Sequence, residues 1–364
     1  MDLQHVRVKR ERLTSFCATI FERLGLPPAD AQVAAKVLVA ADARGIPSHG
    51  VARLERYVNG LLDGVVIADA AVEVLADTPT SIVLHAHGAM GAPVSARAMR
   101  AVIAKAAATG AAFGCVRDSN HFGIAGYYAM MAMEQDMIGI AMTNTAALGV
   151  PTFGRQVMFG TNPIAFAAPA HRECGFVLDM ATTVVTRGKI EVYDRLDEPL
   201  PPGWAVDKTG TPATDAHRIL EDMFHRVGGG IMPLGGAGEL HGGHKGYGMG
   251  VMVDILCAVL CGAPFGRSVA DTESSSGRVS HFFGAVRIDT FRDPMSFRQD
   301  MDDLLRDLRT SPPAEGAERV YFGGLKEFER EWEAAEKGVL LLRQTYDHIA
   351  SVGQTYGVEP PPVA

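Results

Sequence analysis

The sequence predicts an α/β or α+β fold in which an N-terminal helical region precedes alternating strands and helices. Two patterns indicate this fold class. Residues 9–62 place apolar side chains at helical spacing, and from residue 71 short apolar strands alternate with helical segments. Apolar residues make up 47% of the 364-residue chain and charged residues 21%, which is the balance of a globular protein with a large core. This composition excludes an intrinsically disordered chain.

Three helical segments are expected at the start of the chain. The first covers residues 9–24 and ends at Gly25. The second follows Pro27 and Pro28, has Asp30 near its N-cap, and runs to about Ala43 before Gly45. Glycine is common just after a helix because it adopts the left-handed conformation without strain. The third helix is expected over residues 51–62.

The length of the chain predicts more than one domain, at about 150 residues per domain. We expect an N-terminal helical domain over residues 1–75, joined by C-terminal helices within residues 325–355. The second domain covers residues 76–324, where strands and helices alternate. It begins with a β-hairpin, because two short apolar runs flank the turn sequence DTPTS.

The rest of the second domain is assigned from its apolar runs and its turn residues. In order, we expect a helix over 93–108, a strand over 113–119, a helix over 126–135, a strand over 137–144, mainly strands over 154–180, surface loops over 195–245, a helix over 247–262, a polar loop over 271–277, a strand over 278–288, and helices near 296–308 and 325–337. The helix over 247–262 is apolar nearly all round and is therefore predicted to be buried. Its apolar stretch carries Asp254 and is expected to be too short and too polar to cross a membrane.

Charge and cysteine content narrow the possible partners. The net charge is −8 and the basic residues are scattered, which argues against a nucleic-acid partner. The N-terminus lacks the apolar core of a signal peptide, and five cysteines are too few for a disulfide framework. We therefore expect a cytoplasmic protein without a membrane partner.

Several kinds of nucleotide-binding and catalytic site are not expected, because the sequence lacks their motifs. The chain has no G-x-G-x-x-G between a strand and a helix, no phosphate-binding G-x-x-x-x-G-K-[ST] and no G-x-S-x-G. Ser48 and His49 are adjacent, and adjacent side chains rarely point at each other, so they do not indicate a serine protease. No metal site is expected, because neither His241 with His244 nor the pair at positions 85 and 87 has a zinc-binding motif.

Histidines in glycine-rich segments are the better candidates for chemistry. His49 lies in PSHGVARLERY and His121 in DSNHFGIAG, and an imidazole exchanges a proton near neutral pH. On a helix that begins near Gly50, Arg53 and Tyr57 would share a face with His49. An arginine there binds a carboxylate with two parallel hydrogen bonds. The alternative is a solvated face on which Arg53 pairs with a surface glutamate.

Eight segments occur in an order that resembles the type-2 malate/L-lactate dehydrogenase family. They are ADARGIPSHGVARLERY, SNHFGIAGYY, MIGIAMTN, GTNPIAFAAP, LDMATTVVTRGKI, PPGWAVDKTGTPATD, PLGG and GHKGYGMGVMVDIL. The likeness covers about residues 10–340. The family includes ureidoglycolate dehydrogenase, diketogulonate reductase, sulfolactate dehydrogenase and piperideine/pyrroline-2-carboxylate reductases.

The resemblance implies a non-Rossmann fold that binds NAD or NADP in the second domain, and a homodimer. It implies that His49 or His121 is the general acid/base, and that Ser48, Arg53 and Tyr57 bind the substrate. The implied coenzyme-binding residues are Asn144, Thr145, Thr161, Asn162, Asp179, Met180, Ala181, His244, Lys245 and Gly246. After the MTN segment, Thr145 and Ala146 offer no charge to a polar substrate tail.

The activity expected from this resemblance is reversible hydride transfer between a nicotinamide and C2 of a small 2-oxo or 2-hydroxy acid, of the malate or lactate type. Reduction of a cyclic imine acid, such as pyrroline- or piperideine-2-carboxylate, needs the same arginine and coenzyme and stays an alternative. A zinc-dependent hydrolase built on the histidine-rich loops and a catalytically silent nucleotide-binding protein are alternatives from other classes.

Overall fold

The computed structural model describes residues 4–269 and 277–363, and it contains the mixture of helices and strands that the sequence predicts. The strands are β1 (His5–Val8), β2 (Glu73–Asp77), β3 (Ser81–His85), β4 (Ala111–Ser119), β5 (Met137–Thr143), β6 (Ile164–Ala168), β7 (Phe176–Met180), β8 (Ala205–Val206), β9 (Pro212–Ala213), β10 (Gly230–Ile231), β11 (Val279–Arg287) and β12 (Val339–Leu342). The α-helices are α1 (Arg10–Arg23), α2 (Pro28–Ala43), α3 (Leu54–Leu62), α4 (Gly91–Thr109), α5 (Ala125–Met133), α6 (Arg187–Leu196), α7 (Ala216–Phe224), α8 (Gly243–Cys257), α9 (Pro294–Thr310), α10 (Leu325–Lys337) and α11 (Arg343–Thr355).

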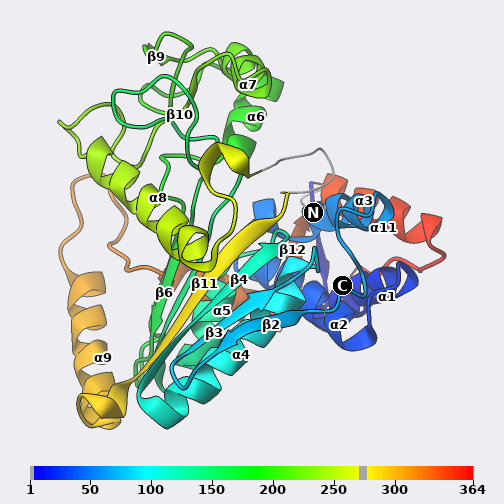
Figure 1. The fold of residues 1–364 in the computed structure, drawn as a ribbon, viewed down its shortest axis with the longest axis vertical. Coiled ribbons are helices and arrows are strands. Elements are labelled where there is room, and N and C mark those ends of the chain that lie inside the picture. The colour runs from blue at the N-terminus through cyan, green and yellow to red at the C-terminus, as the bar shows by residue number, and fades with distance from the viewer. Residues whose placement is uncertain (1–3, 270–276, 364) are drawn as a thin grey trace.

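A seven-stranded mixed sheet forms the centre of the molecule, with the strand order β2-β3-β4-β11-β5-β6-β7 (Figure 1). Strand β11 lies between β4 and β5 and pairs with both in antiparallel register. Strand β3 pairs with β4 in parallel, with helix α4 connecting them. The predicted α/β fold class is therefore confirmed.

Helices cover both faces of this sheet. Neighbouring side chains of a strand point to opposite faces, and two phenylalanines of β11 show it. Phe283 packs into the cluster formed with α4 and α5, whereas Phe282 packs with Val253 and Cys257 of α8. Helix α8 is less buried than the sequence predicts, because Met252 and Ile255 are exposed on the side away from the sheet.

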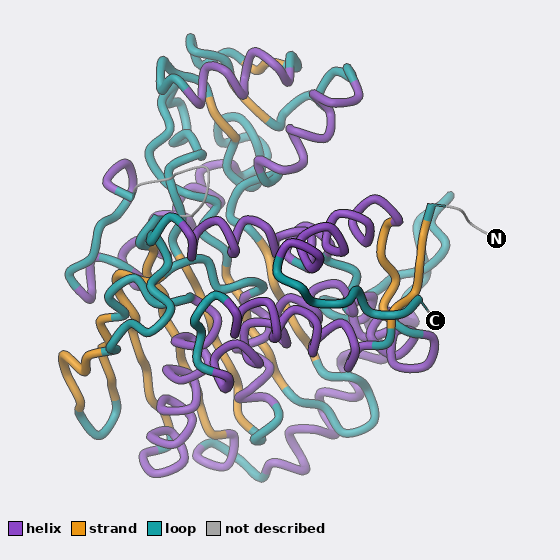
Figure 2. The backbone as a smooth tube through the Cα atoms, turned by 90° about the vertical axis from the view of Figure 1, so that its right-hand side faces the viewer, coloured by secondary structure: helices purple, strands orange, loops and turns teal. Residues whose placement is uncertain are grey.

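The N-terminal helices share one hydrophobic cluster with the end of the chain. Phe21 of α1 and Leu38 of α2 belong to the same cluster as Leu341 of β12 and Ile349 of α11. Strand β1 pairs with β12 in antiparallel register, so the two ends of the chain lie side by side (Figure 2). The domain boundaries given above stay a prediction.

A smaller lobe rises above the main sheet in Figure 1 and contains α6, α7 and the short sheet β10-β8-β9. The expectation that residues 195–245 only loop across the surface was wrong. Asp215 caps α7 by accepting a hydrogen bond from the Arg218 N–H, and Ile219 and Met223 of this helix are buried in the core of the lobe. Apolar residues four apart after a capping aspartate are the signal that could have predicted α7.

Other differences from the predicted elements are local. The helix expected from residue 51 is preceded by two 3-10 turns, Pro47–His49 and Val51–Arg53, and begins only at Leu54. Strands β1 and β12 and helix α6 were not predicted. Of the polar loop expected over 271–277, residues 271–276 lie outside the described part of the chain.

The segment Gly243–Cys261 meets the length and composition criteria for crossing a membrane, with 19 residues and a mean hydropathy of 1.2. The expectation that this stretch is too short was therefore wrong. A core helix passes the same test, so one such segment is weak evidence for a membrane span. Its packing against Phe282 of the sheet accounts for the apolar side chains on one face.

Candidate functional site

One edge of the main sheet gathers most of the predicted site residues. The register pairs Val279 with Ser119 and His281 with Thr143, so the end of β4, the start of β11 and the end of β5 meet there. The register also pairs Ile164 with Met180, which places the start of β6 and the end of β7 at the same edge. Four predicted site residues lie one or two positions beyond these strand ends: His121, Asn144, Asn162 and Ala181.

Two predicted histidines from distant parts of the sequence lie together. The rings of His49 and His121 are stacked with centroids 5.4 Å apart. The Tyr57 hydroxyl lies 2.6 Å from Nδ1 of His121, and the Gly123 N–H donates to the same nitrogen at 3.3 Å. Both protein contacts therefore use Nδ1, which leaves Nε2 of His121 as the nitrogen able to meet a ligand.

The Arg53 guanidinium is held through its Nε atom. Its Nε donates to the Ser48 carbonyl oxygen at 2.7 Å, which orients the two terminal nitrogens of the guanidinium. Ser48 also contacts His49, because its Oγ lies 2.9 Å from Nδ1 of that ring. The expectation that these adjacent side chains do not point at each other was therefore wrong.

Burial and neighbouring positive charge keep both imidazoles neutral. Burial, together with Arg53, lowers the pKa of His49 to about 4. Burial, and then the neighbouring His49 and Arg53, lowers the pKa of His121 well below its ordinary value. Burial also raises the pKa of the Tyr57 hydroxyl, so Tyr57 stays protonated. The cluster of His49, Arg53, Tyr57 and His121 therefore carries one fixed positive charge beside neutral rings that accept a proton.

A buried aspartate holds the segment that carries these residues. Asp42 of α2 accepts a hydrogen bond from the Val51 N–H at 2.7 Å. Gly50 passes so close that a Cβ atom there would lie 2.1 Å from Oδ1 of Asp42. The two 3-10 turns replace the predicted helix start because the chain bends over this carboxyl group. No local pattern marks Asp42, because its hydrogen-bond partner Val51 is reached only in the folded chain.

The first prediction concerns the stability of Asp42→Asn. Burial raises the pKa of Asp42 from 3.8 to about 7, so the folded protein binds a proton that the unfolded chain releases between those pH values. Asp42 therefore destabilises the fold progressively as pH rises from about 4 to 7, by up to about 4 kcal/mol at 1.36 kcal/mol per pKa unit. Asparagine still accepts from Val51 and carries no charge. We expect urea unfolding to show that Asp42→Asn gains stability relative to the native protein between pH 5 and 8.

The exposed Asp69 supplies the control. The Asp69→Asn variant should keep a constant stability difference from the native protein across the same pH range. If the stability difference between Asp42→Asn and the native protein is equally independent of pH, the role given to the buried carboxyl group is contradicted.

The predicted coenzyme residues of the MTNT and GTNP segments form an internal network. The Asn144 amide accepts from the Ser280 N–H and donates to the Pro264 carbonyl, and the Asn162 amide accepts from the Thr145 N–H and donates to the Gly250 carbonyl. Both asparagine side chains therefore make their hydrogen bonds to other residues of the protein. They position the backbone and hydroxyl groups of this edge.

The N-terminus of α8 offers a different kind of site. His244 and Lys245 are exposed in its first turn, which contains no acidic residue. A Cβ atom at Gly246 would lie 2.2 Å from the Leu234 carbonyl oxygen, so the helix end packs tightly under that loop. The free N–H groups of a helix N-terminus and a nearby ammonium suit a phosphate.

The remaining predicted residues come from the end of β7. Oδ2 of Asp179 accepts from the Gly126 N–H of α5 at 2.7 Å, and Met180 and Ala181 are half-buried beside it.

Sequence reasoning missed the histidine that joins the parts of this edge. His281 is fully buried, and its two ring nitrogens lie 2.8 Å from the Thr143 hydroxyl and 2.9 Å from the Ser119 hydroxyl. Its ring stacks on Phe122, next to His121, with centroids 4.5 Å apart. His281 therefore links the strand that precedes His121 to the strand that precedes Asn144. A histidine within an otherwise apolar strand is the signal that could have found it.

Comparison with known proteins identifies relatives along the whole chain. The malate/L-lactate dehydrogenase family profile matches residues 8–350. Malate dehydrogenase from Pyrococcus abyssi is 40% identical over 359 residues, which cover 99% of this chain and 97% of that protein. L-sulfolactate dehydrogenase from Methanocaldococcus jannaschii is 35% identical over 322 residues, which cover 88% of this chain and 89% of that protein.

A solved structure shows the same architecture. The crystal structure of malate dehydrogenase from Entamoeba histolytica superposes with a TM-score of 0.93 at 31% sequence identity, and the match covers 99% of this chain and 100% of that chain.

Proposed function

The chain belongs to the malate/L-lactate dehydrogenase family, and from this premise we propose that it catalyses reversible hydride transfer between a nicotinamide coenzyme and C2 of malate or a close 2-hydroxy acid. The family resemblance inferred from the ordered motifs is confirmed, and a 2-hydroxy acid dehydrogenase is the activity that the relatives support. The observation that carries the proposal is the cluster of Arg53, Tyr57, His49 and His121, in which a carboxylate-binding cation lies beside neutral imidazoles.

Arg53 binds the C1 carboxylate of the substrate in this proposal. Its Nε is held by the Ser48 carbonyl, so the terminal nitrogens are oriented before the substrate arrives. The paired hydrogen bonds of a guanidinium and a carboxylate fix the plane of the acid and therefore the position of its C2 atom.

His121 exchanges the proton of the C2 oxygen. Tyr57 lies 2.6 Å from Nδ1, and its hydroxyl accepts from Nδ1–H in the tautomer that leaves the Nε2 lone pair for the substrate proton. In the other tautomer Nδ1 accepts, which is the arrangement in which the Gly123 N–H donates to it. Nε2 then takes the proton of a 2-hydroxy acid during oxidation and returns it during reduction. We assign this role to His121 rather than His49, because Nδ1 of His49 is bound only to the more exposed Ser48 hydroxyl.

NAD or NADP would be held at the same sheet edge. Lys245 and His244 at the start of α8 suit its phosphates, and Gly246 allows the close packing of that turn. The backbone and hydroxyl groups of Thr145 and Thr161, positioned by the Asn144 and Asn162 amides, and the Asp179–Ala181 segment would line the rest. When bound, the coenzyme supplies the hydride acceptor or donor.

The relatives favour a 2-hydroxy acid over the alternative reactions. Malate dehydrogenase is the description of the relative that is 40% identical along the full chain, whereas reduction of a cyclic imine acid and zinc-dependent hydrolysis are not favoured. The histidines considered for hydrolysis, His241 and His244, are exposed.

The proposal is tested by titrating the purified protein with NADH and NADPH and following the coenzyme fluorescence. We expect saturable binding of at least one coenzyme, followed by oxidation of malate, lactate or sulfolactate when the same coenzyme is supplied in its oxidised form. Binding of neither coenzyme would remove the dehydrogenase proposal. Turnover with pyrroline-2-carboxylate and with none of the 2-hydroxy acids would replace it with imine reduction.

A second copy of the chain is proposed to cover one face of α8 and the turn that follows it. Met252, Ile255 and Val259 are exposed at a spacing that places them on one side, and Leu260 and Phe265 extend this apolar surface. Sedimentation analysis should show a homodimer that Ile255→Glu converts to a monomer. A native protein that sediments as a monomer would contradict the proposal.

A cytoplasmic location is proposed from the cysteines. All five are free thiols, and four of them are buried. Free cysteines without disulfides are typical of a reducing compartment.

A further inference from the structure

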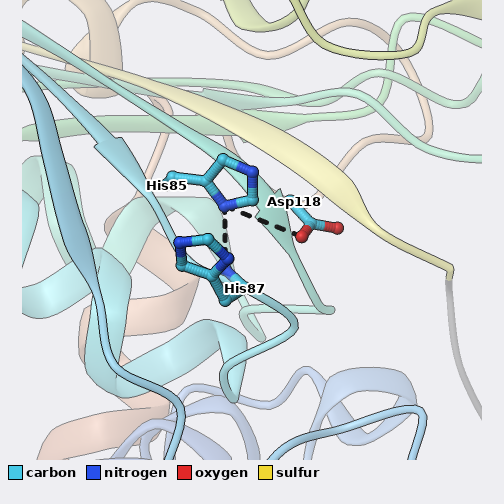
Figure 3. A group of neighbouring side chains, drawn as sticks. All are labelled: His85, His87 and Asp118. Carbon is cyan, nitrogen blue, oxygen red and sulfur yellow. Dashed lines mark hydrogen bonds and ion pairs between the residues drawn. The ribbon is translucent and has the colours of Figure 1, made fainter.

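Two histidines and an aspartate outside the site described above lie close together at the other end of the same sheet edge. His85 ends β3, His87 follows it by two residues, and Asp118 lies near the end of β4. The parallel register of β3 and β4 pairs His85 with Arg117, so these two strands end side by side. Figure 3 shows the two imidazole rings stacked on each other, with centroids 3.8 Å apart, and the Asp118 carboxylate beside Nδ1 of His85.

The backbone holds this cluster in place. The Ala86 N–H donates to the Arg117 carbonyl at 2.9 Å, and the Gly88 N–H donates to the Asp118 carbonyl at 2.8 Å. His87 and Asp118 have φ angles of 50° and 57°, in the left-handed region that non-glycine residues rarely adopt. Strained conformations of this kind persist where the surroundings determine them, and they gather at functional sites.

The spacing of the three side chains fits a metal ion. One potential ligand atom from each of His85, His87 and Asp118 lies within 4.8 Å of the other two. Nδ1 of His85 and Oδ2 of Asp118 are 3.7 Å apart. In a tetrahedral zinc site with bonds of about 2.0–2.1 Å, the ligand atoms lie roughly 3.4 Å from each other. The two rings are stacked with centroids 3.8 Å apart, and the His87 N–H donates to Nδ1 of His85 at 3.1 Å. Binding one ion therefore requires the His87 ring to rotate out of the stack.

A further carboxylate beside His87 and an access route are also present. Glu73 of β2 pairs with His85 across the strands, and its Oε2 lies 3.1 Å from Nε2 of His87. His87 is 45% exposed and Asp118 25% exposed, so an ion reaches the cluster directly from solvent. His85 is less exposed, at 19%.

An arginine pairs with the same carboxylate group. Nη1 of Arg278 lies 2.9 Å from both oxygens of Asp118. A metal ion bound by the same carboxylate competes with this cation. Removing the arginine charge should therefore strengthen metal binding.

We propose that His85, His87 and Asp118, with Glu73 as the fourth ligand, bind one divalent transition-metal ion of the zinc type. Two imidazoles and carboxylate oxygens are ligands that suit zinc and its neighbours rather than calcium or magnesium. The ion ties β2, β3 and β4 together at the sheet edge.

This metal site lies next to the loop that carries His121. Asp118 precedes His121 by three residues, and the Asn120 amide between them donates to the Gly88 carbonyl at 2.8 Å. The metal is therefore a structural clamp on that loop. The proposal does not depend on the dehydrogenase activity, because its readouts are metal binding and thermal stability.

The test uses the full chain after chelation and dialysis, titrated with Zn²⁺ in competition with a chromogenic chelator and with Co²⁺ by visible absorption. We expect one Zn²⁺ per chain, a Co²⁺ spectrum typical of tetrahedral coordination, and a higher melting temperature with Zn²⁺. His87→Ala should weaken Zn²⁺ binding by at least about tenfold and abolish the rise in melting temperature. Arg278→Gln should tighten binding.

The matched control is His217→Ala, which removes an exposed histidine that pairs with Asp194 at 3.3 Å outside the cluster. This variant should bind Zn²⁺ as the native protein does. If His87→Ala does not fold, Glu73→Gln provides the test of metal binding. Glu73 lies on an exposed strand, and the loss of the fourth ligand should also weaken Zn²⁺ binding. Absence of saturable Zn²⁺ binding in the native protein, or full affinity in both variants, would overturn the proposal.

Discussion

Replacing His121 by alanine should lower kcat for oxidation of the 2-hydroxy acid by about 10²–10⁴-fold, the usual contribution of a positioned general acid or base. Nε2 of His121 is the nitrogen left free by Tyr57 and Gly123, so the variant removes the group that takes the substrate proton. Steady-state kinetics with saturating coenzyme would measure the loss. The KM of the acid should change much less, because Arg53 still binds the carboxylate.

Two further variants make the His121 result specific. His49→Ala should lose less activity than His121→Ala, since the Tyr57 contact is made only by His121 among the two rings. His348→Ala removes a surface histidine paired with Glu55 and should have native activity. Near-native turnover of His121→Ala would remove this residue from the mechanism, and a larger loss in His49→Ala would move the role to that ring.

The pH dependence of oxidation follows from the same ring. The group must be neutral to accept a proton, and its pKa is held well below 6.5 by burial and by the neighbouring His49 and Arg53. The value of kcat/KM should therefore stay level as pH falls from 8 to about 6.5 and decline only at lower pH, since kcat/KM reports the free enzyme. Loss of half the activity at pH 7 would show that the ring is not protected in this way.

Arg53→Lys should raise the KM of the acid and lower kcat/KM by about 10–100-fold, the equivalent of one charged hydrogen bond. Lysine keeps the positive charge but provides neither the paired hydrogen bonds nor the Nε–H that now donates to the Ser48 carbonyl. Steady-state kinetics with the acid as the varied substrate would measure both constants. Coenzyme binding should be unaffected, which fluorescence titration would show.

The control for Arg53→Lys is Arg292→Lys, an exposed arginine that pairs with Asp300 at 2.7 Å. Its kinetics should match those of the native protein. If Arg53→Lys also keeps a native KM, then the alternative noted at the outset, a solvated face with no ligand, describes this arginine better.

Local sequence patterns predicted much of the fold. The first helix begins and ends within about one residue of the predicted limits, because apolar spacing and terminal glycines act within a few residues of each other. The second helix ends where predicted but begins at Pro28, earlier than the cap expected near Asp30. Helix α7 was missed because the surrounding glycines and prolines hid a short amphipathic segment. The late start of α3 depends on Asp42, whose hydrogen bond to Val51 forms only when α2 is already in place.

The candidate site shows the same limit. His49 and His121 were found because glycine-rich loops mark them, but their stacking joins segments that are far apart in the sequence. His281 was missed because its polar partners, Ser119 and Thr143, come from two other strands. Residues whose role depends on register between distant strands cannot be read from their own neighbourhood.

The pairing of β1 with β12 has a consequence for how the protein is made. His5 lies opposite Leu342, and the apolar interior around Phe21 needs Ile349 from near the end of the chain. While a ribosome is still synthesising the last turn of α10, strand β12 and helix α11 do not yet exist. The helices that support Arg53 and Tyr57 then lack the apolar residues that cover one side of their cluster. The cluster that supports Arg53 and Tyr57 is therefore completed only after β12 and α11 have been synthesised, and a product truncated before them would leave an open apolar surface for chaperones or proteases to recognise.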